Sequence, residues 1–277
     1  MKISIIGNGY VGKATEFLFT KIPSDEQPAE LLALDVVVYD KDPSKTKCSF
    51  KEVLNSDLFF VCVPTPMKEN GSCDLSFVEE VLYKLTSSGV ASHKIVLRST
   101  VPVGTCDRFG VNFFPEFLTE ANWRKDIEET KDWIIGMSSL SYDLRSKIPT
   151  LLKGAIHFCL NSEAELVKYT RNCFLATKVS FFNEINNFCE SKNINYKNVI
   201  DLITLDSRIN TSHTSIPGPD GKKGFGGTCF PKDMHSLKFQ MQLAELHPFI
   251  LKAALERNES IDRPEKDWLK DKGRAVV

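Results

Sequence analysis

The sequence has no excess of either charge and no apolar segment long enough to span a membrane. Its 35 basic and 36 acidic residues leave a formal net charge of -1, so no overall field attracts nucleic acid or an anionic membrane. No run reaches the roughly 18 consecutive apolar residues of a transmembrane helix, and the N-terminus has no secretory signal. We therefore expect a soluble, cytoplasmic protein with neither a nucleic-acid partner nor a membrane association.

Metal-binding and disulfide patterns are missing as well. The eight cysteines are scattered, with no C-x-x-C pair and no nearby paired histidines, so we expect no metal site and no disulfide framework. Cys62 and Cys159 lie inside apolar runs, where a cysteine behaves as a small hydrophobe. Only Cys229 has a polar, glycine-lined setting, in the stretch GFGGTCFPKD from Gly224 to Asp233.

Short apolar runs fill the first half of the chain. Their hydrophobicity is continuous rather than alternating, which is typical of strands buried on both faces of a parallel sheet. We therefore predict an α/β fold with an N-terminal Rossmann-like, doubly wound parallel sheet. The predicted strands are KISII, DVVVY, LFFVCV, KIVLRS, VNFF, DWIIGM and AIHFCL, and residues 22–30 are predicted to form a surface loop.

The second half is predicted to be mostly α-helical. From Ser162, an N-cap residue, apolar residues recur at helical spacing with no Gly or Pro between them, which indicates one long helix. A shorter helix is predicted over YKNVIDLITL, and another from Pro231 to about Glu256. Because 277 residues suit two domains, we predict a Rossmann domain over 1–160 and a helical central domain over 161–277.

The first predicted strand runs into a glycine-rich turn. Gly7, Gly9 and Gly12 have the G-x-G-x-x-G spacing between a strand and a helix, which lets the backbone contact a pyrophosphate. Asp40 ends the next strand and is placed to bind an adenosine ribose, which favours NAD over its phosphorylated form. Lys45 is a further candidate at the ribose, although a solvated lysine is the commoner outcome. The alternative is a tight turn without a cofactor.

A second group of candidates lies in the helical half. Cys229 precedes a predicted helix, where the helix dipole lowers a thiol's pKa and favours the nucleophilic thiolate. The alternative is a glycine turn with a buried, inert cysteine. Lys168 and Asn172, four residues apart on the long helix, share one face and form a candidate oxyanion site, unless Lys168 is simply a solvated charge.

Two glutamates follow a predicted strand in the stretch FFPEFLTE. Glu116 and Glu120 are four residues apart. Carboxylates in such a place can act as bases, or they can merely solvate the start of a helix. The residues alone leave both interpretations open.

These motifs occur together in the UDP-glucose dehydrogenases of the UDP-glucose/GDP-mannose dehydrogenase family, which the chain resembles from residue 1 to about 256. The resemblance rests on the whole set of motifs. They are GNGYVG, VPTP, STVPVGT, PEFLTE, AELVKYTRN, SRI and PGPDGKKGFGGTCFPKD.

The resemblance implies an oxidoreductase that moves two hydrides in succession from the C6 alcohol of a nucleotide sugar to two NAD molecules, ending in a uronic acid. Cys229 would capture the intermediate aldehyde as a thiohemiacetal, and the second oxidation would give a thioester that water releases. Lys168 and Asn172 would steady negative charge at the C6 oxygen.

The resemblance also assigns hydrolysis and binding positions. Glu120 matches the general base in hydrolysis, while Asp233 and Thr100 would help to order the water. Arg208 matches an arginine that reaches the sugar nucleotide from a neighbouring subunit, which implies a homodimer packed around the long helix; the alternative is an ordinary loop arginine. The positions that match cofactor contacts are Gly7, Gly9, Tyr10, Val11, Gly12, Asp40, Lys45, Thr65, Thr100 and Glu120. Those that match substrate contacts are Glu116, Lys168, Asn172, Arg208, Gly226 and Gly227.

Two features depart from the family pattern. The residues before Pro115 are NFF, where many relatives have Asn directly before Pro-Glu-Phe. Family members usually continue into a third domain that grips the nucleotide, whereas this chain ends at Val277. We therefore expect a short form, a fragment, or weak nucleotide binding.

Alternative functions stay open. UDP-glucose is favoured over GDP-mannose as the substrate by GFGG and CFPKD. A two-electron β-hydroxyacid-type dehydrogenase also pairs a Rossmann domain with Lys and Asn at a spacing of four. A non-catalytic NAD-binding dimer is the third possibility, although it would need none of this chemistry.

Overall fold

The computed structural model describes residues 1–20, 34–119, 122–138 and 142–277, so the predicted loop at 22–30 lies outside the described residues. The chain divides into two compact units. Unit 1 comprises Met1–Thr65 and Leu75–Lys168, and unit 2 comprises Pro66–Asp74 and Tyr169–Val277. The start of the long helix thus belongs to unit 1, and the domain boundary at 160/161 stays a prediction.

Unit 1 contains a seven-stranded sheet in the order β2-β1-β3-β4-β5-β6-β7. Neighbouring strands are parallel except for β5 and β6, which pair antiparallel through Phe113 and Gly136. Continuous hydrophobicity does not encode strand direction, so the pattern could not reveal this reversal. The strands are β1 (Lys2–Ile6), β2 (Asp35–Tyr39), β3 (Leu58–Val61), β4 (Ile95–Leu97), β5 (Asn112–Phe113), β6 (Asp132–Met137) and β7 (Ala155–Leu160), so all seven predicted strands are confirmed.

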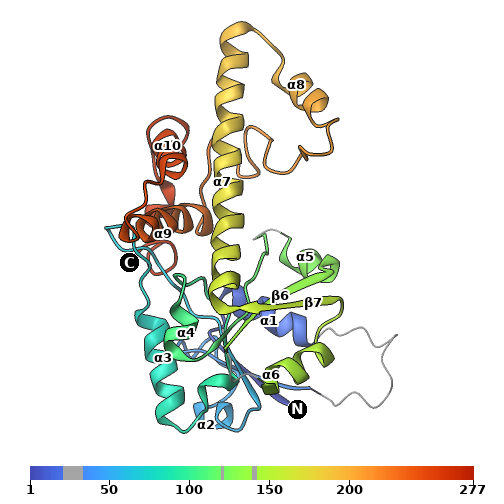
Figure 1. The fold of residues 1–277 in the computed structure, drawn as a ribbon, viewed down its shortest axis with the longest axis vertical. Helices are drawn as coiled ribbons and strands as arrows, with labels where there is room; N and C mark the ends of the chain where they lie inside the picture. The colour runs from blue at the N-terminus through green and yellow to red at the C-terminus, as the bar shows by residue number, and fades with distance from the viewer. Residues whose placement is uncertain (21–33, 120–121, 139–141) are drawn as a thin grey trace. The chain divides into compact units, whose positions relative to one another are not determined.

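Helices cover both faces of the sheet, which confirms the doubly wound fold (Figure 1). One core joins α1, α5 and α6 to the sheet face that carries Ile5 and Phe60, and the other joins α2, α3 and α4 to the face that carries Phe59 and Val61. Consecutive residues of β3 alternate between these cores because strand side chains point to opposite faces. The helices are α1 (Tyr10–Thr20), α2 (Phe50–Val53), α3 (Ser76–Ser87), α4 (Thr105–Phe109), α5 (Trp123–Glu129) and α6 (Tyr142–Lys147), with short 3₁₀ turns η1 (Ser92–Lys94) and η2 (Ile148–Thr150).

The strand order reverses direction next to β1. This strand lies between β2 and β3, so the chain winds away from it in both directions. In an open α/β sheet, ligands bind outside the carboxyl ends of the strands at such a point. The loops that follow β1, β2, β3 and β4 all leave from that edge, because these strands are parallel.

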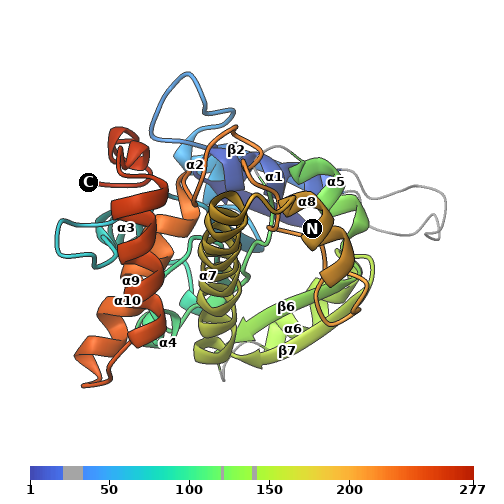
Figure 2. The same cartoon turned by 90° about the horizontal axis from the view of Figure 1, so that it is seen from above.

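Helices make up most of unit 2. The predicted long helix is confirmed as α7 (Asn161–Lys192), and the predicted shorter helix is α8 (Tyr196–Ile203). The views in Figures 1 and 2 show α9 (Cys229–Leu243) and α10 (Phe249–Arg257) on one side of α7 and α8 on the other. A core containing Cys173, Met234 and Ala254 joins α7 to α9 and α10.

The predicted single helix from Pro231 to about Glu256 is wrong, because two helices cover this stretch. After α9 ends, Glu245 adopts a left-handed backbone conformation with φ of 58°. Pro248, which lacks a backbone N–H and cannot continue a helix from the preceding turn, then becomes the N-cap of α10. The apolar periodicity continues across the break, which explains the error.

The charged segment after α10, for which the sequence analysis predicts no structure, is folded. It forms a single π-helical turn, η3 (Asn258–Asp262), and a 3₁₀ turn, η4 (Asp267–Lys270). Its last residues pair with the segment Pro66–Asp74: Met67 N donates to Ala275 O at 2.8 Å, and Val277 N donates to Met67 O at 3.0 Å. Trp268 and Ala275 are buried in this arrangement.

Candidate functional site

In the glycine turn after β1, two glycines lie against other backbone atoms and one has open space beside it. A Cβ on Gly7 would lie 2.6 Å from Cys62 O, and one on Gly12 would lie 1.9 Å from Gly7 O. Nothing lies within 4 Å of the position that a Cβ on Gly9 would take. Gly9 therefore leaves the backbone open where Tyr10 and Val11 start α1, and the N-terminus of that helix supplies N–H donors for a pyrophosphate.

Asp40 is tied to the glycine turn. Its Oδ2 accepts a hydrogen bond from Asn8 N at 2.5 Å, and the Asn8 side chain donates to Lys45 O at 2.6 Å. The Lys45 ammonium lies 3.1 Å from Asp42. Hydrogen bonds from Ser44 and then from Lys45 lower the pKa of Asp42 to about 2. In this structure Lys45 therefore pairs with a carboxylate, and its predicted contact with a ribose stays a prediction.

Thr65 and Thr100 connect the loops that follow β3 and β4. The Thr65 hydroxyl donates to Thr100 O at 2.8 Å, and both residues are buried. Both loops leave the sheet at the same edge as the glycine turn. This edge thus presents an open glycine, a helix N-terminus and the Asp40 carboxylate, which together fit a dinucleotide.

Glu116 and Lys168 form a buried ion pair in unit 1. The Lys168 Nζ donates to Glu116 Oε1 at 2.8 Å and to Glu116 O at 2.7 Å, and Leu118 N donates to Oε2 at 2.9 Å. Burial alone would raise the pKa of Glu116, but the charge and hydrogen bond of Lys168 outweigh it and lower that pKa. The interpretation of Lys168 as a solvated charge is therefore wrong, since only 3% of the residue is exposed.

A second buried cation, which the sequence analysis missed, lies near this pair. The Arg98 guanidinium stacks 4.1 Å from the centroid of the Phe114 ring. Its Nε and Nη1 find no hydrogen-bond partner among the described residues. Burial lowers the pKa of Arg98, and the charge of Glu116 works against that effect.

Glu165 anchors the start of α7 and was also missed. Its carboxylate is completely buried and accepts hydrogen bonds from Gly104 N at 2.6 Å and Cys106 N at 2.8 Å. These groups belong to the first turn of α4, at the end of the STVPVGT stretch. Because Glu165 precedes Lys168 by three residues, this contact sets the position of the turn that carries the lysine.

A hydrogen-bonded group in unit 2 surrounds Asp233. Asn172 Nδ2 donates to Asp233 Oδ2 at 2.6 Å, and Lys232 Nζ donates to Oδ1 at 2.5 Å. Asp233 is 1% exposed, so both carboxylate oxygens are satisfied inside the protein. Asn172 lies one helical turn beyond Lys168 on α7, in the next unit along the chain.

Cys229 is the first residue of α9, and it is the only exposed cysteine of the eight, all of which are described. The alternative of a buried thiol is therefore wrong. Burial alone would lower the pKa of Lys232, but the Asp233 carboxylate and a negatively charged Cys229 sulfur outweigh it and raise that pKa. A cation and a helix N-terminus thus both favour the thiolate of Cys229.

The glycines before Cys229 have different surroundings. A Cβ on Gly224 would lie 2.3 Å from Asn258 Oδ1, and one on Gly226 would lie 2.3 Å from Arg263 Nη1. No atom lies within 4 Å of the corresponding position on Gly227, whose φ is 69°. Arg263 thus fills the space beside Gly226, and the predicted approach of a hexose to Gly226 and Gly227 stays a prediction.

Two predicted site residues remain, Glu120 and Arg208. Glu120 lies outside the described residues. The exposed Arg208 side chain pairs with the Asp206 carboxylate, with its Nη2 2.5 Å from Oδ2. Its predicted contact with a substrate across a subunit interface stays a prediction.

Lys232 is the main omission from the sequence analysis. The signal was present, because a cation in the first turn of a helix is disfavoured by the helix dipole and needs a reason. Arg98 offered a weaker signal, since it directly follows the apolar run IVL of a predicted strand, whereas Glu165 lies in a stretch that also contains polar residues and the sequence gives no sign of its burial.

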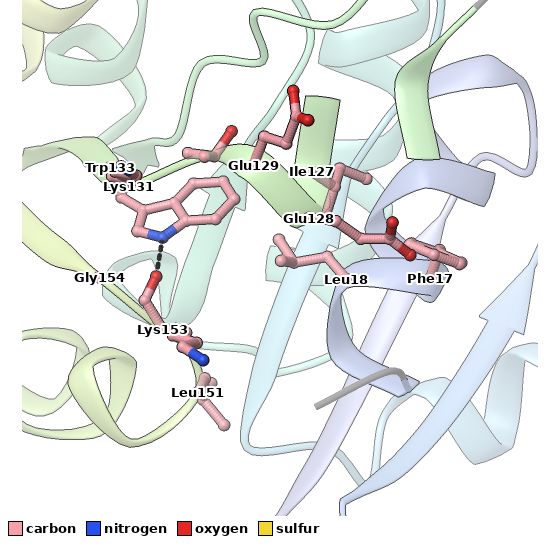
Figure 3. Close-up of a pocket in the computed structure, with 11 residues that line it drawn as sticks. Phe17, Leu18, Ile127, Glu128, Glu129, Lys131, Trp133, Leu151, Lys153 and Gly154 are labelled. Atoms are coloured by element: carbon pink, nitrogen blue, oxygen red, sulfur yellow. Dashed lines mark hydrogen bonds between the residues drawn. The ribbon is translucent and has the colours of Figure 1, made fainter. Parts of the chain in front are cut away.

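A cavity of about 670 Å³ lies elsewhere in unit 1 (Figure 3). Its lining includes Phe17, Trp133 and Leu151, and the Trp133 indole donates to Lys153 O at 2.6 Å. None of the predicted site residues lines it. In the described part of the chain, no cluster of three or more His, Cys, Asp or Glu could hold a metal, and no helix is long and apolar enough to cross a membrane.

Comparisons with known proteins match both halves of the chain. Residues 34–148 match the NAD binding domain of the UDP-glucose/GDP-mannose dehydrogenase family, and residues 162–260 match its central domain. The chain is 32% identical over 300 residues to a UDP-glucose 6-dehydrogenase of Rickettsia bellii, covering 95% of this chain and 68% of that relative.

Other relatives name other substrates. A GDP-mannose 6-dehydrogenase of Pseudomonas aeruginosa is 31% identical over 294 residues, covering 90% of this chain and 66% of the relative. Among solved structures, a UDP-glucose dehydrogenase from the archaeon Pyrobaculum islandicum superposes with a TM-score of 0.78 at 27% identity. That comparison covers 93% of this chain and 68% of the archaeal one.

Proposed function

This chain belongs to the UDP-glucose/GDP-mannose dehydrogenase family, and from that premise we propose that it oxidises UDP-glucose to UDP-glucuronate in two NAD-dependent steps. Residues 34–148 are the family's NAD-binding domain. The observation that carries the proposal is the exposed Cys229 at the start of α9, beside Lys232 and the Asp233–Asn172 hydrogen bond.

The glycine turn and Asp40 would hold the cofactor. Gly9 offers bare backbone for the pyrophosphate at the N-terminus of α1, and the Asp40 carboxylate would accept hydrogen bonds from the ribose hydroxyls. NAD, when bound, supplies a hydride acceptor for each oxidation. The remaining chemistry belongs to side chains of this chain.

Cys229 is the proposed nucleophile. Its thiolate adds to the C6 aldehyde formed by the first oxidation, and a proton goes to the resulting oxygen to give the thiohemiacetal. The second oxidation converts this adduct into a thioester, and water then releases the acid and regenerates the thiol. Lys232 favours the thiolate that starts this sequence.

Lys168 and Asn172 would stabilise the negative charge that develops on the C6 oxygen. Both are buried and already donate to carboxylates, Glu116 for Lys168 and Asp233 for Asn172, so their donors are held in place before substrate binds. Glu120 is proposed as the base that activates the hydrolytic water, with Asp233 and Thr100 ordering that water.

A homodimer is part of the proposal. Phe174, Phe181 and Phe188 recur every seven residues along α7 and are 65%, 55% and 57% exposed. Such a stripe on one face of a long helix favours packing against a second copy. We expect wild-type protein to sediment as a dimer and Phe181→Glu to shift it towards monomer.

The NADH yield per sugar tests the proposed reaction. UDP-glucose should give two NADH per molecule and end as the uronic acid. One NADH per substrate without dependence on Cys229 would favour the two-electron hydroxyacid dehydrogenase instead. GDP-mannose and UDP-N-acetylhexosamines, assayed in parallel, test the substrate, and NAD binding without turnover of any sugar nucleotide would favour the non-catalytic dimer.

Substitution of the nucleophile tests the mechanism. Cys229→Ser should lower acid formation by at least about a thousandfold. Cys159→Ser is the matched control, because Cys159 lies on β7 in unit 1. Glu120→Gln should let the thioester accumulate as added mass on the protein. Full activity of Cys229→Ser would exclude a covalent route.

A further inference from the structure

The segment from Asn258 to Val277 holds the glycine-rich stretch in front of Cys229. We call Gly224–Thr228 the cysteine loop. Three side chains from the segment, those of Asn258, Arg263 and Asp271, contact the loop or fill space against it. The central-domain match ends at residue 260, so Arg263 and Asp271 lie beyond the part of the chain that the family model covers.

Asn258 clamps the start of the loop. Its Oδ1 accepts from Phe225 N at 2.8 Å, and its Nδ2 donates to Phe225 O at 2.9 Å. Asn258 is completely buried and Phe225 is 3% exposed. Both backbone groups of one loop residue are therefore paired with one amide, which fixes the orientation of that peptide.

Arg263 fills the middle of the loop. Only 2% of the residue is exposed, and its guanidinium pairs with Asp220 through Nη2 and with Asp267 through Nε, at 3.1 Å for the latter pair. The guanidinium lies where a Cβ of Gly226 would be. Glycine is thus required here by a side chain of this protein.

Asp271 holds the end of the loop, directly before the thiol. The Thr228 hydroxyl donates to Asp271 Oδ2 at 2.8 Å. Thr228 is the N-cap residue of α9, yet its side chain caps no N–H of that helix. Asp271 is itself anchored, because its backbone oxygen accepts from Ala275 N at 2.9 Å and Ala275 pairs with Met67.

We propose that Asn258, Arg263 and Asp271 are positioning residues for Cys229, and that the hydrogen bond between Asp271 and Thr228 holds the thiol in the first turn of α9. A stretch with three glycines in four residues has much backbone entropy to lose, so side chains must hold it. A cysteine displaced from the first turn loses the helix dipole that favours its thiolate. The role as positioning residues for catalysis rests on the proposed function, whereas the effect on the thiol does not.

Alkylation of Cys229 by iodoacetamide tests the inference without a substrate. Thr228→Val removes the donor at nearly unchanged shape and leaves the charges of Asp271, Lys232 and Asp233 in place. We expect it to slow alkylation of Cys229 about twofold to tenfold, the fold-change that corresponds to the net free energy of a typical hydrogen bond. Thr228→Ser, which keeps the hydroxyl, should react at close to the wild-type rate. Mass spectrometry of the labelled peptide identifies the site.

Asp271 provides the second arm of the test. Asp271→Asn keeps an acceptor for Thr228 and should preserve the positioning, whereas Asp271→Ala should not. The double variant Thr228→Val with Asp271→Ala should slow alkylation of Cys229 as much as Thr228→Val alone does, because each substitution removes the same hydrogen bond. NAD binding and the midpoint of unfolding are measured for each variant to detect general damage to the fold. If Thr228→Val or Asp271→Ala does not fold, the other of these two variants still tests the hydrogen bond.

Turnover separates the two proposals. In the acid-forming assay, Thr228→Val should lower kcat with little change in KM, and Thr228→Ser should restore it. If wild-type protein oxidises no sugar nucleotide while the Val and Ser variants still differ in alkylation, the proposed function is wrong and the positioning stands. Equal alkylation rates for wild type, Thr228→Val and Asp271→Ala would overturn the positioning.

Discussion

The turn after β1 and the cysteine loop each contain three glycines, but the atoms that crowd those glycines differ between the two loops. In each, two glycines are required by the protein's own packing and one is open: Gly9 in the turn after β1 and Gly227 in the cysteine loop. Around Gly7 and Gly12 the nearest neighbours are backbone atoms, those of Cys62 and of Gly7 itself. Around the cysteine loop they are side chains of Asn258 and Arg263, from the end of the chain.

This difference determines how each loop responds when a side chain is added at one of its glycines. Backbone neighbours cannot move without displacing strands, so the turn after β1 tolerates no added atom at Gly7 or Gly12. Side-chain neighbours can rotate away or be substituted, so the cysteine loop is adjustable. The segment that supplies these side chains also contains Glu259, whose pKa is lowered in the folded protein.

The largest effect is expected at Gly12. A Cβ there would lie 1.9 Å from Gly7 O, so Gly12→Ala should cost more than about 4 kcal/mol of unfolding free energy and leave little folded unit 1. Denaturant unfolding followed by circular dichroism measures this. A variant as stable as wild type would contradict the backbone packing described for the turn.

A smaller and conditional effect is expected at Gly226. Gly226→Ala should cost about 1–3 kcal/mol, since the buried Arg263 guanidinium must move. In an Arg263→Ala background the same substitution should cost close to nothing, because the obstacle is gone. A double-mutant cycle in unfolding free energy measures this coupling, and additive costs would show that Arg263 is not what requires the glycine.

Gly9 separates ligand binding from folding. Nothing in the protein occupies the space beside Gly9, so Gly9→Ala should change the unfolding midpoint little. It should weaken NAD binding about tenfold or more, because the added methyl lies where the pyrophosphate is proposed to contact the backbone. Fluorescence titration with NAD gives the Kd, and an unchanged Kd would place the dinucleotide elsewhere.

The smallest effect concerns pH. Glu259, next to Asn258, accepts from His235 at 2.7 Å and from Lys266 at 2.6 Å, and the His235 hydrogen bond in particular lowers the pKa of Glu259 from 4.5 to about 2. A carboxylate whose pKa is lower in the folded state stabilises the fold above its ordinary pKa, and that contribution is lost as pH falls from 4.5 towards 2.

The measurement is the unfolding free energy of wild type and Glu259→Gln against pH. At neutral pH the variant should be less stable by up to about 1 kcal/mol, a value reduced by solvent screening of a partly exposed pair. The two curves should converge as acid is added. Parallel curves would show that the ion pairs of Glu259 with His235 and Lys266 contribute nothing to the pH dependence of the stability.

Much of the fold could be predicted from the sequence, because it depends on residues that are close together along the chain. All seven strands follow from continuous apolar runs, and α7 follows from uninterrupted helical spacing. The direction of β6 could not be predicted, because a strand buried on both faces has the same continuous apolar pattern in either orientation. The break at Pro248 was missed because the apolar period continues through it.

For the site, the sequence by itself determined the residue types and the local frame. The glycine spacing after β1, the cysteine at the start of a predicted helix and the spacing of Lys168 and Asn172 are all properties of short stretches. Only the tertiary structure decided that Lys168 pairs with Glu116, that Lys232 and Asn172 share Asp233, and that residues 258–271 hold the cysteine loop. Except for the contact between the neighbours Lys232 and Asp233, these contacts join side chains distant in sequence, and the burial that strengthens them appears only when the chain is folded.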